Sequence, residues 1–286
     1  MIKGWRLHLV LFLATVLSTL LAGAYYIQDY NPFREFPRYL LTGLVKGVPF
    51  SLPLLTILGA HEFAHYINSR RHGVEATLPF FIPFPNMFGT LGAVIKMKSG
   101  ISDRGALIDI GASGPLVGFV LSVAACAVGL SLSTASAARP LKEGDMMLGG
   151  SLLYIFLMEV FVKADLARQA VNLHPIAVAG WVGLFVTSIN LMPVGQLDGG
   201  HIAYAFFAGR HRLVSRIFIL LMALMGLVFP GWLLWAALLL IIGTRHPPVM
   251  DQERPLDFRR RLAGAAALVV FIITFPPVPI YIYGSL

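Results

Sequence analysis

Long apolar stretches, separated by short polar or basic segments, run through most of this chain. A helix that crosses a membrane needs about 20 mostly apolar residues, because each residue adds about 1.5 Å. The pattern therefore predicts a polytopic, all-α membrane protein. Five stretches have about the required length: residues 7–26, 47–68, 106–131, 175–192 and 262–282.

A sixth apolar stretch, residues 213–243, is interrupted by Pro230 and Gly231. It is too long for one ordinary span, so we expect a hairpin of two short helices instead. The predicted number of membrane-spanning helices is then about seven. With a cytoplasmic N-terminus, this arrangement leaves most basic residues on the cytoplasmic side, as the positive-inside rule expects. A single span would put the basic segment 245–261 outside. The cytoplasmic basic residues are then Lys3, Arg6, Arg70, Arg71, Lys96, Lys98, Arg104, Arg210, Arg212, Arg216, Arg245, Arg254, Arg259, Arg260 and Arg261.

Two apolar segments do not fit a simple span. Residues 148–162 are too few to cross the membrane, and we expect an interfacial or re-entrant helix there. Residues 77–99 are rich in Pro, Phe and Gly, and their second half, residues 91–97, is typical of a strand. Non-helical backbone is tolerated at membrane depth only where protein or a water-filled cavity satisfies it. The expected fold therefore includes a re-entrant, β-hairpin-like loop.

Composition agrees with a membrane protein and excludes a soluble enzyme. The 286 residues are 57% hydrophobic and only 13% charged, and their mean hydropathy is +0.76, whereas soluble domains carry about 25% charged residues. One cysteine excludes a disulfide framework and a thiolate-rich metal site. The net charge of +8 is explained by the basic residues that the predicted topology places on the cytoplasmic side. Nucleic-acid binding is not predicted, because no basic stripe is interleaved with aromatic residues away from the membrane edge.

The first apolar stretch has two interpretations. Lys3 and Arg6 followed by an apolar run and small residues at 22–24 resemble a signal peptide with its cleavage site. The run is longer than a usual signal core, so a retained helix is favoured.

The strongest chemical signal is His61-Glu62-Phe63-Ala64-His65, near the end of the second stretch. Residues i and i+4 share one face of a helix, so both imidazoles can reach one cation. Glu62 directly follows His61, so its side chain leaves the helix from the neighbouring position. From there its carboxylate can reach a metal-bound water without ligating the metal. Unpaired ionisable groups are costly inside an apolar span, which favours a zinc site over two solvated histidines.

A catalytic zinc ion normally has three protein ligands, so a third is needed. Asp198 is the best candidate, because its segment ends another span that runs from outside to inside and therefore lies at the same depth as His61 and His65. Pro193, Gly195 and the Gly199-Gly200 pair allow a turn that aims Asp198 inward. The alternatives are Asp109, Glu159, His174 and His201; Asp109 could instead pair locally, and His201 could donate a hydrogen bond to Asp198 or simply begin a helix.

Together, the HExxH motif and N-x-x-P-x-x-x-x-D-G, on separate membrane segments, resemble the site-2 protease family of intramembrane zinc metalloproteases. Further segments resemble the branch found in cyanobacteria, plastids and many other bacteria, without a PDZ domain or a long N-terminal soluble extension. These segments are residues 78–83, 88–93 and 109–115.

The resemblance implies one Zn²⁺ per chain, bound by His61, His65 and Asp198, with Glu62 as general base. It implies that Asn190 hydrogen-bonds the substrate backbone or developing oxyanion and that residues 88–97 form a hairpin beside the zinc. Substrate-binding roles are expected for four hairpin residues, which are Gly89, Gly92, Val94 and Ile95.

We therefore expect a single domain over residues 1–286 that cleaves transmembrane protein substrates within the bilayer. Residues 1–46 would form the N-terminal helix and outer loop, 47–200 the catalytic core, and 201–286 the C-terminal helices. A bacterial cytoplasmic membrane is expected because no transit peptide is recognised, with the active site nearer the cytoplasmic face. Alternatives are a divalent-metal transporter, a non-catalytic relative that binds membrane helices, and a membrane zinc peptidase for lipidated or soluble peptides. The sequence predicts neither substrate nor oligomeric state.

One small-residue motif is interpreted as helix packing. Gly114 and Gly118 are spaced by four residues in an apolar stretch, which lets another backbone or side chain approach closely.

Overall fold

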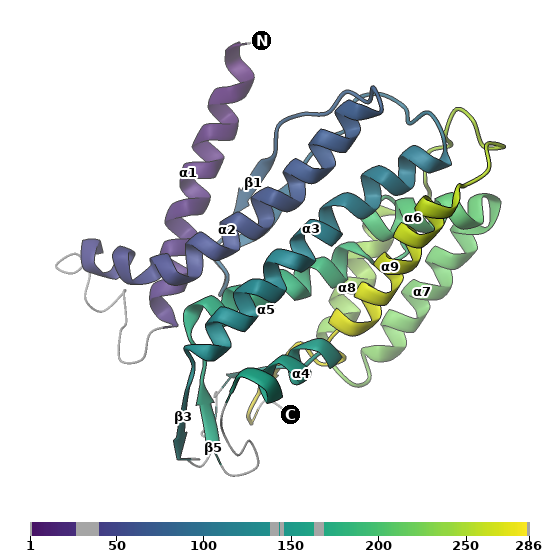
Figure 1. The fold of residues 1–286 in the computed structure, drawn as a ribbon. Helices are drawn as coiled ribbons and strands as arrows, with labels where there is room; N and C mark the ends of the chain where they lie inside the picture. Colours follow the sequence, from purple (N-terminus) through teal and green to yellow (C-terminus); the bar gives the residue numbers. More distant parts are fainter. Residues whose placement is uncertain (1, 27–39, 138–142, 144–145, 163–168, 285–286) are drawn as a thin grey trace.

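The computed structural model describes residues 2–26, 40–137, 143, 146–162 and 169–284 (Figure 1). Most of these residues are helical, as the apolar pattern predicts. The outer loop expected before residue 46 falls partly outside the described residues. The helices are α1 (Ile2–Tyr25), α2 (Leu40–Arg71), α3 (Arg104–Ser131), α4 (Leu152–Phe161), α5 (Pro175–Asn190), α6 (Asp198–Phe207), a 3-10 turn (Ala208–Arg210), α7 (His211–Met225), α8 (Gly231–Ile242) and α9 (Phe258–Thr274).

Three helices are long and apolar enough to cross a membrane by length and composition. They cover Trp5–Tyr25 in α1, Gly43–Arg71 in α2 and Arg104–Ser131 in α3. Large apolar side chains on α7, α8 and α9 are also exposed, among them Leu220, Leu234 and Leu268. Such a surface requires a lipid environment, so the chain is a membrane protein.

The C-terminal part confirms one expectation and corrects another. Residues 213–243 do form two helices, α7 and α8, that separate around Pro230. The prediction of a continuous helix over residues 262–282 is wrong, because α9 ends at Thr274. Three prolines between residues 276 and 279 cannot continue a helix, and Ile280–Ile282 forms strand β6 instead.

Short strands add small sheets to the helical framework. The expected hairpin within residues 77–99 is present as β1 (Phe80–Pro83) paired antiparallel with β2 (Thr90–Val94). The all-α expectation is thus incomplete, since two further antiparallel pairs form in the described chain. They are β3 (Thr134–Ala137) with β5 (Gln169–Asn172), and β4 (Met146–Leu148) with β6 (Ile280–Ile282).

Helix α3 is the centre of the structure, with α2, α5, α6 and α9 packed around it (Figure 1). Glycine makes the closest of these contacts possible. A Cβ at Gly129 would overlap the backbone of Ala177 in α5, and one at Gly180 would lie 2.6 Å from the backbone nitrogen of Cys126 in α3. Small residues therefore let α3 and α5 approach backbone to backbone.

Helix α1 packs against α2 and against the β1–β2 hairpin. The Thr19 and Ser51 hydroxyls are hydrogen-bonded at 2.6 Å between α1 and α2. The Ser18 hydroxyl donates to the Gly89 carbonyl in the hairpin turn at 2.5 Å. These contacts hold the hairpin beside α2, which carries the HExxH residues.

Candidate metal centre

Two distant parts of the chain meet at His61, His65 and Asp198. His61 and His65 lie one turn apart on α2, and Asp198 is the first residue of α6. The Asp198 Oδ2 atom lies 3.2 Å from Nε2 of each histidine, and the two Nε2 atoms are 3.1 Å apart. Both histidines are buried. The three ligand atoms form a nearly equilateral triangle.

This triangle fits a zinc ion. Ligands at about 2.0–2.1 Å from tetrahedral zinc are separated from one another by about 3.3 Å, close to the distances found here. Two imidazoles and one carboxylate are also a known catalytic donor set that leaves the fourth position open. The described residues contain one group of three His, Cys, Asp or Glu side chains with converging ligand atoms, and it is this one.

The backbone of α3 orients His65. Its Nδ1 atom lies 2.8 Å from the Ile110 carbonyl, so Nδ1–H donates to that oxygen. The proton on Nδ1 leaves the Nε2 lone pair free, and Nε2 is the atom that faces Asp198. A hydrogen bond from the non-ligating nitrogen is the usual way in which a protein fixes a histidine ligand.

Gly114 and Gly118 of α3 provide space for the two imidazoles. A Cβ at Gly114 would overlap the His65 ring, and one at Gly118 would lie 3.0 Å from Nδ1 of His61. The small-residue motif therefore has a packing role, and the groups that pack against it are the two histidines of α2, which lie directly against α3.

Asp198 reaches the histidines because α6 begins beside the end of α5. Gly195 adopts a positive φ of 56° in the turn between these helices, a conformation that glycine adopts without strain. A Cβ at Gly199 would overlap the Leu191 carbonyl, and one at Gly200 would lie 2.5 Å from the Gly195 carbonyl. The Gly199-Gly200 pair is thus required for close backbone approach, which aims Asp198 inward as expected.

Glu62 lies beside the three candidate ligands. Its Oε1 is 3.9 Å from Nε2 of His61. The side chain is buried. It lines a pocket of about 170 Å³ together with His65 and Asp198. Val94, the last residue of β2, and Ile95, which follows it, also line this pocket.

The other expected substrate-binding residues divide into two groups. Asn190 lines the pocket, and its Nδ2 is 3.4 Å from Nε2 of His61. Gly89 lies against α1 instead, and both Gly89 and Gly92 have positive φ, 74° and 105°. These two glycines therefore have an evident role in turn geometry, and neither is among the residues that line the pocket.

A known protein family matches the part of the chain that contains these candidate ligands. Residues 49–230 match the model of peptidase family M50, and this range contains all three candidate ligands. The chain belongs to peptidase family M50, the site-2 protease family.

The M50 chain is similar to several plant proteins. It is 32% identical over 290 residues to the probable zinc metalloprotease EGY1, chloroplastic, of Arabidopsis thaliana, covering 94% of this chain and 52% of that protein. It is 26% identical over 250 residues to the probable zinc metalloprotease EGY2, chloroplastic, of the same plant, covering 85% and 44%. The chain thus spans about half the length of these relatives.

One further similarity is shorter. The DDT domain-containing protein PTM of Arabidopsis thaliana is 41% identical over 130 residues, which is 44% of the M50 chain and 8% of that protein.

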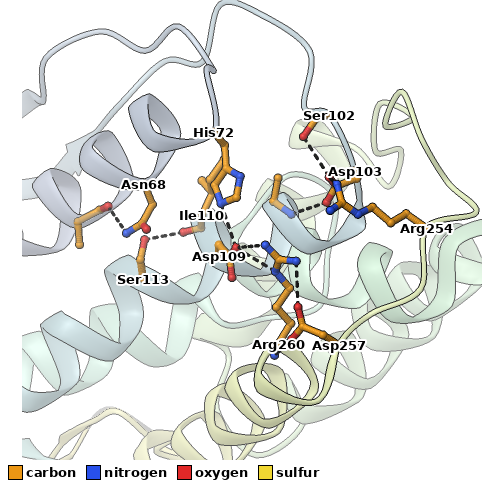
Figure 2. Close-up of polar contacts among 12 residues, drawn as sticks. Asn68, His72, Ser102, Asp103, Asp109, Ile110, Ser113, Arg254, Asp257 and Arg260 are labelled. Carbon is orange, nitrogen blue, oxygen red and sulfur yellow. Dashed lines mark hydrogen bonds and ion pairs between the residues drawn. The ribbon is translucent and has the colours of Figure 1, made fainter.

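Asp109, the main alternative ligand, is engaged elsewhere in the M50 chain. Its Oδ2 lies 2.9 Å from Nε2 of His72 and accepts from Nε and Nη2 of Arg260 at 3.0 and 2.8 Å (Figure 2). Arg260 also donates to Asp257 at 3.0 Å. This network connects the end of α2, the start of α3 and the start of α9. Asp109 precedes Ile110, the residue that orients His65, so it supports the centre without reaching the ligand atoms.

A second ion pair holds the first turn of α3. Asp103 caps this helix by accepting from the Ala106 N–H at 2.9 Å, and it pairs with Arg254 at 2.9 Å (Figure 2). Burial alone would raise the pKa of Asp103, but these two contacts outweigh burial, and the pKa is lowered. The lowered pKa favours the carboxylate form, which is also stabilised by the positive end of the helix dipole at the start of α3.

The remaining alternative ligands also lie outside the triangle. His201 is buried, and its Nδ1 is 2.6 Å from Nε2 of His246; the expected hydrogen bond from His201 to Asp198 is not among the contacts of the described residues. His174 caps α5 through the Ile176 N–H. Glu159 lies on α4, away from the centre.

Enlarging Gly114 tests whether the α3 surface positions the ligands. Gly114→Ala would push the His65 ring away and should lower zinc affinity by about 10- to 100-fold, measured by competition with a chelator. Gly118→Ala, where the contact is looser, should have a smaller effect. Gly209→Ala, with no atom within 4 Å of the added Cβ, is the control. Unchanged affinity in Gly114→Ala would contradict this role of α3.

Proposed function

We propose that this chain is an intramembrane zinc endopeptidase that hydrolyses a peptide bond in or near a transmembrane segment of membrane-protein substrates. The observation that carries the proposal is the triangle of His61, His65 and Asp198, with the buried Glu62 carboxylate 3.9 Å from Nε2 of His61. Membership of peptidase family M50 and the membrane-length helices support it. Zinc would be held by the two Nε2 atoms and one Asp198 oxygen.

When bound, zinc supplies Lewis-acid chemistry, because it polarises a peptide carbonyl and acidifies water. Glu62 takes a proton from the attacking water and returns it to the leaving amine. The Glu62 side chain lines the pocket beside Val94 and Ile95. Asn190 is placed to donate from Nδ2 to the substrate carbonyl oxygen as negative charge develops there.

A helical substrate must unwind before it can be cleaved, since its carbonyls are bound in i→i−4 hydrogen bonds. Strand β2 is suited to receive the unwound backbone. It pairs with β1 on one side, and it belongs to a two-stranded sheet. Leu91 and Val94 are 60% and 49% exposed, and Val94 lines the pocket. We infer that substrate adds to β2 as a strand, which replaces its lost hydrogen bonds.

The proposed topology has seven spans, formed by α1, α2, α3, α5, α7, α8 and α9, with the N-terminus in the cytoplasm. The basic residues support this orientation, which places the metal centre nearer the cytoplasmic face and makes β1–β2 a re-entrant hairpin. Helices α7 and α8, with 15 and 12 residues, are shorter than a full span and would lie in a thinned region. The sequence expectation is a bacterial cytoplasmic membrane, whereas the named relatives are chloroplastic.

The three candidate ligands lie together at one point. This arrangement disfavours a metal transporter, because a transporter needs ligands along a path to both faces of the membrane. A protein that only binds membrane helices would not need the carboxylate of Glu62 in the pocket. Both alternatives predict no cleavage, so a proteolysis assay separates them from the proposal.

Replacing Glu62 tests the proposed chemistry. In proteoliposomes that also contain candidate single-span proteins, Glu62→Gln should slow cleavage by about 10²- to 10⁴-fold and retain uncut substrate. Its zinc content should equal that of wild type, because Glu62 is not a ligand. Glu159→Gln, an exposed site on α4, is the matched control. Equal cleavage by Glu62→Gln and wild type would refute the assignment.

Proline in β2 tests substrate pairing. Val94→Pro removes a backbone donor and restricts the strand, so cleavage should be lost while zinc remains bound. Val94→Ala keeps the backbone donor and should retain most activity. Thermal unfolding of both variants shows whether the hairpin is intact. Normal cleavage by a folded Val94→Pro variant would exclude strand addition at this position.

A further inference from the structure

A second hollow, separate from the pocket that contains Glu62, lies between α6, α7 and α9. It is a groove of about 480 Å³ whose described lining is apolar except for Arg261. Its wall on α9 contains Gly264 and Ala265, and its opposite wall contains Phe206 of α6 and Phe218 of α7. Phe206 packs directly against Gly264, where an added Cβ would lie 2.5 Å from its ring, and the groove continues along the other lining residues of α6, α7 and α9.

The length of the groove matches one leaflet of a bilayer. Its lining runs along α9 from Arg261 to Phe271, which is about 15 Å at 1.5 Å per residue. The hydrocarbon core of a bilayer is about 30 Å thick, so the groove is about half as long. A groove of this length would hold an acyl chain from one side of the membrane.

The rim of the groove is positively charged. Arg261, at its end, uses Nε to donate to the Leu256 carbonyl at 3.0 Å. Among the ion pairs of the described residues, none includes Arg261 or its exposed neighbour Arg259. Arg210 and Arg212, which are exposed, follow shortly after Phe207, another lining residue. An anionic group at the rim would find uncompensated cations.

We propose that this groove binds an acyl chain of an anionic phospholipid, with Arg261 contacting the headgroup phosphate. Basic pockets between transmembrane helices are suited to anionic lipid headgroups, and apolar pockets of this volume suit small ligands. A transmembrane helix could insert only one face, because 15 Å of helix with side chains occupies more than about 1,000 Å³, about twice the volume of the groove. Gly199 also lines the groove, so the bound lipid would lie next to the residue that follows Asp198.

Lipid titration of the purified, delipidated full chain tests this proposal without any substrate. Native mass spectrometry would compare phosphatidylglycerol with phosphatidylcholine of identical chains. Wild type should bind phosphatidylglycerol at least about fivefold more tightly, because its headgroup has a net negative charge whereas the choline cation neutralises that of phosphatidylcholine; this is the effect expected for one arginine near a net anionic headgroup. Arg261→Gln should abolish this preference, Arg261→Lys should keep most of it, and Arg70→Gln on α2 should leave it unchanged.

A groove-filling variant tests the position of the chain. Ala265→Trp should weaken the tightest phosphatidylglycerol site by about tenfold or more, and Ala265→Leu should do so to a smaller extent. Thermal unfolding and zinc content of each variant verify that it is folded. The proposal is overturned if folded Arg261→Gln keeps the wild-type lipid preference or if folded Ala265→Trp binds phosphatidylglycerol like wild type. Displacement of the lipid by a single-span peptide would identify a helix-binding site instead.

Discussion

The structure depends on bringing two imidazoles and a carboxylate together inside an apolar helix bundle. Each of these groups is expensive to bury alone. At 3.1–3.2 Å from one another, His61, His65 and Asp198 compensate one another only in part, and a bound cation would satisfy all three lone pairs at once. The centre therefore links metal binding to the position of the first residue of α6 beside α2.

Helix α3 makes that meeting possible, because it contacts both partners. Gly114 and Gly118 accept the two histidine rings, and the Ile110 carbonyl orients one of them. At its start, Asp109 pairs with His72 and Arg260, so the ends of α2 and α9 are held on the same helix. The candidate metal centre is therefore built against one central helix.

Local sequence patterns predicted much of this arrangement. The spacing of His61 and His65 indicates a shared helix face, and topology alone placed Asp198 at the same depth; the β1–β2 hairpin follows from residues that cannot continue a helix. Tertiary contacts were not predictable in the same way. Nothing local shows that Asp109 pairs with Arg260, that His201 meets His246, or that Gly114 lies under His65. Apolar content alone extends the last helix to residue 282, but the prolines near residue 277 end α9 at Thr274.

The most direct test of the metal centre is X-ray absorption spectroscopy at the zinc edge on the purified full chain. The account predicts a light-atom shell at about 2.0–2.1 Å with two imidazole ligands and oxygen in the remaining positions. In Asp198→Ala, the zinc signal should fall or the oxygen contribution should decrease. Unchanged zinc content and an unchanged spectrum in that variant would contradict the central claim that the chain brings these three residues together around one ion.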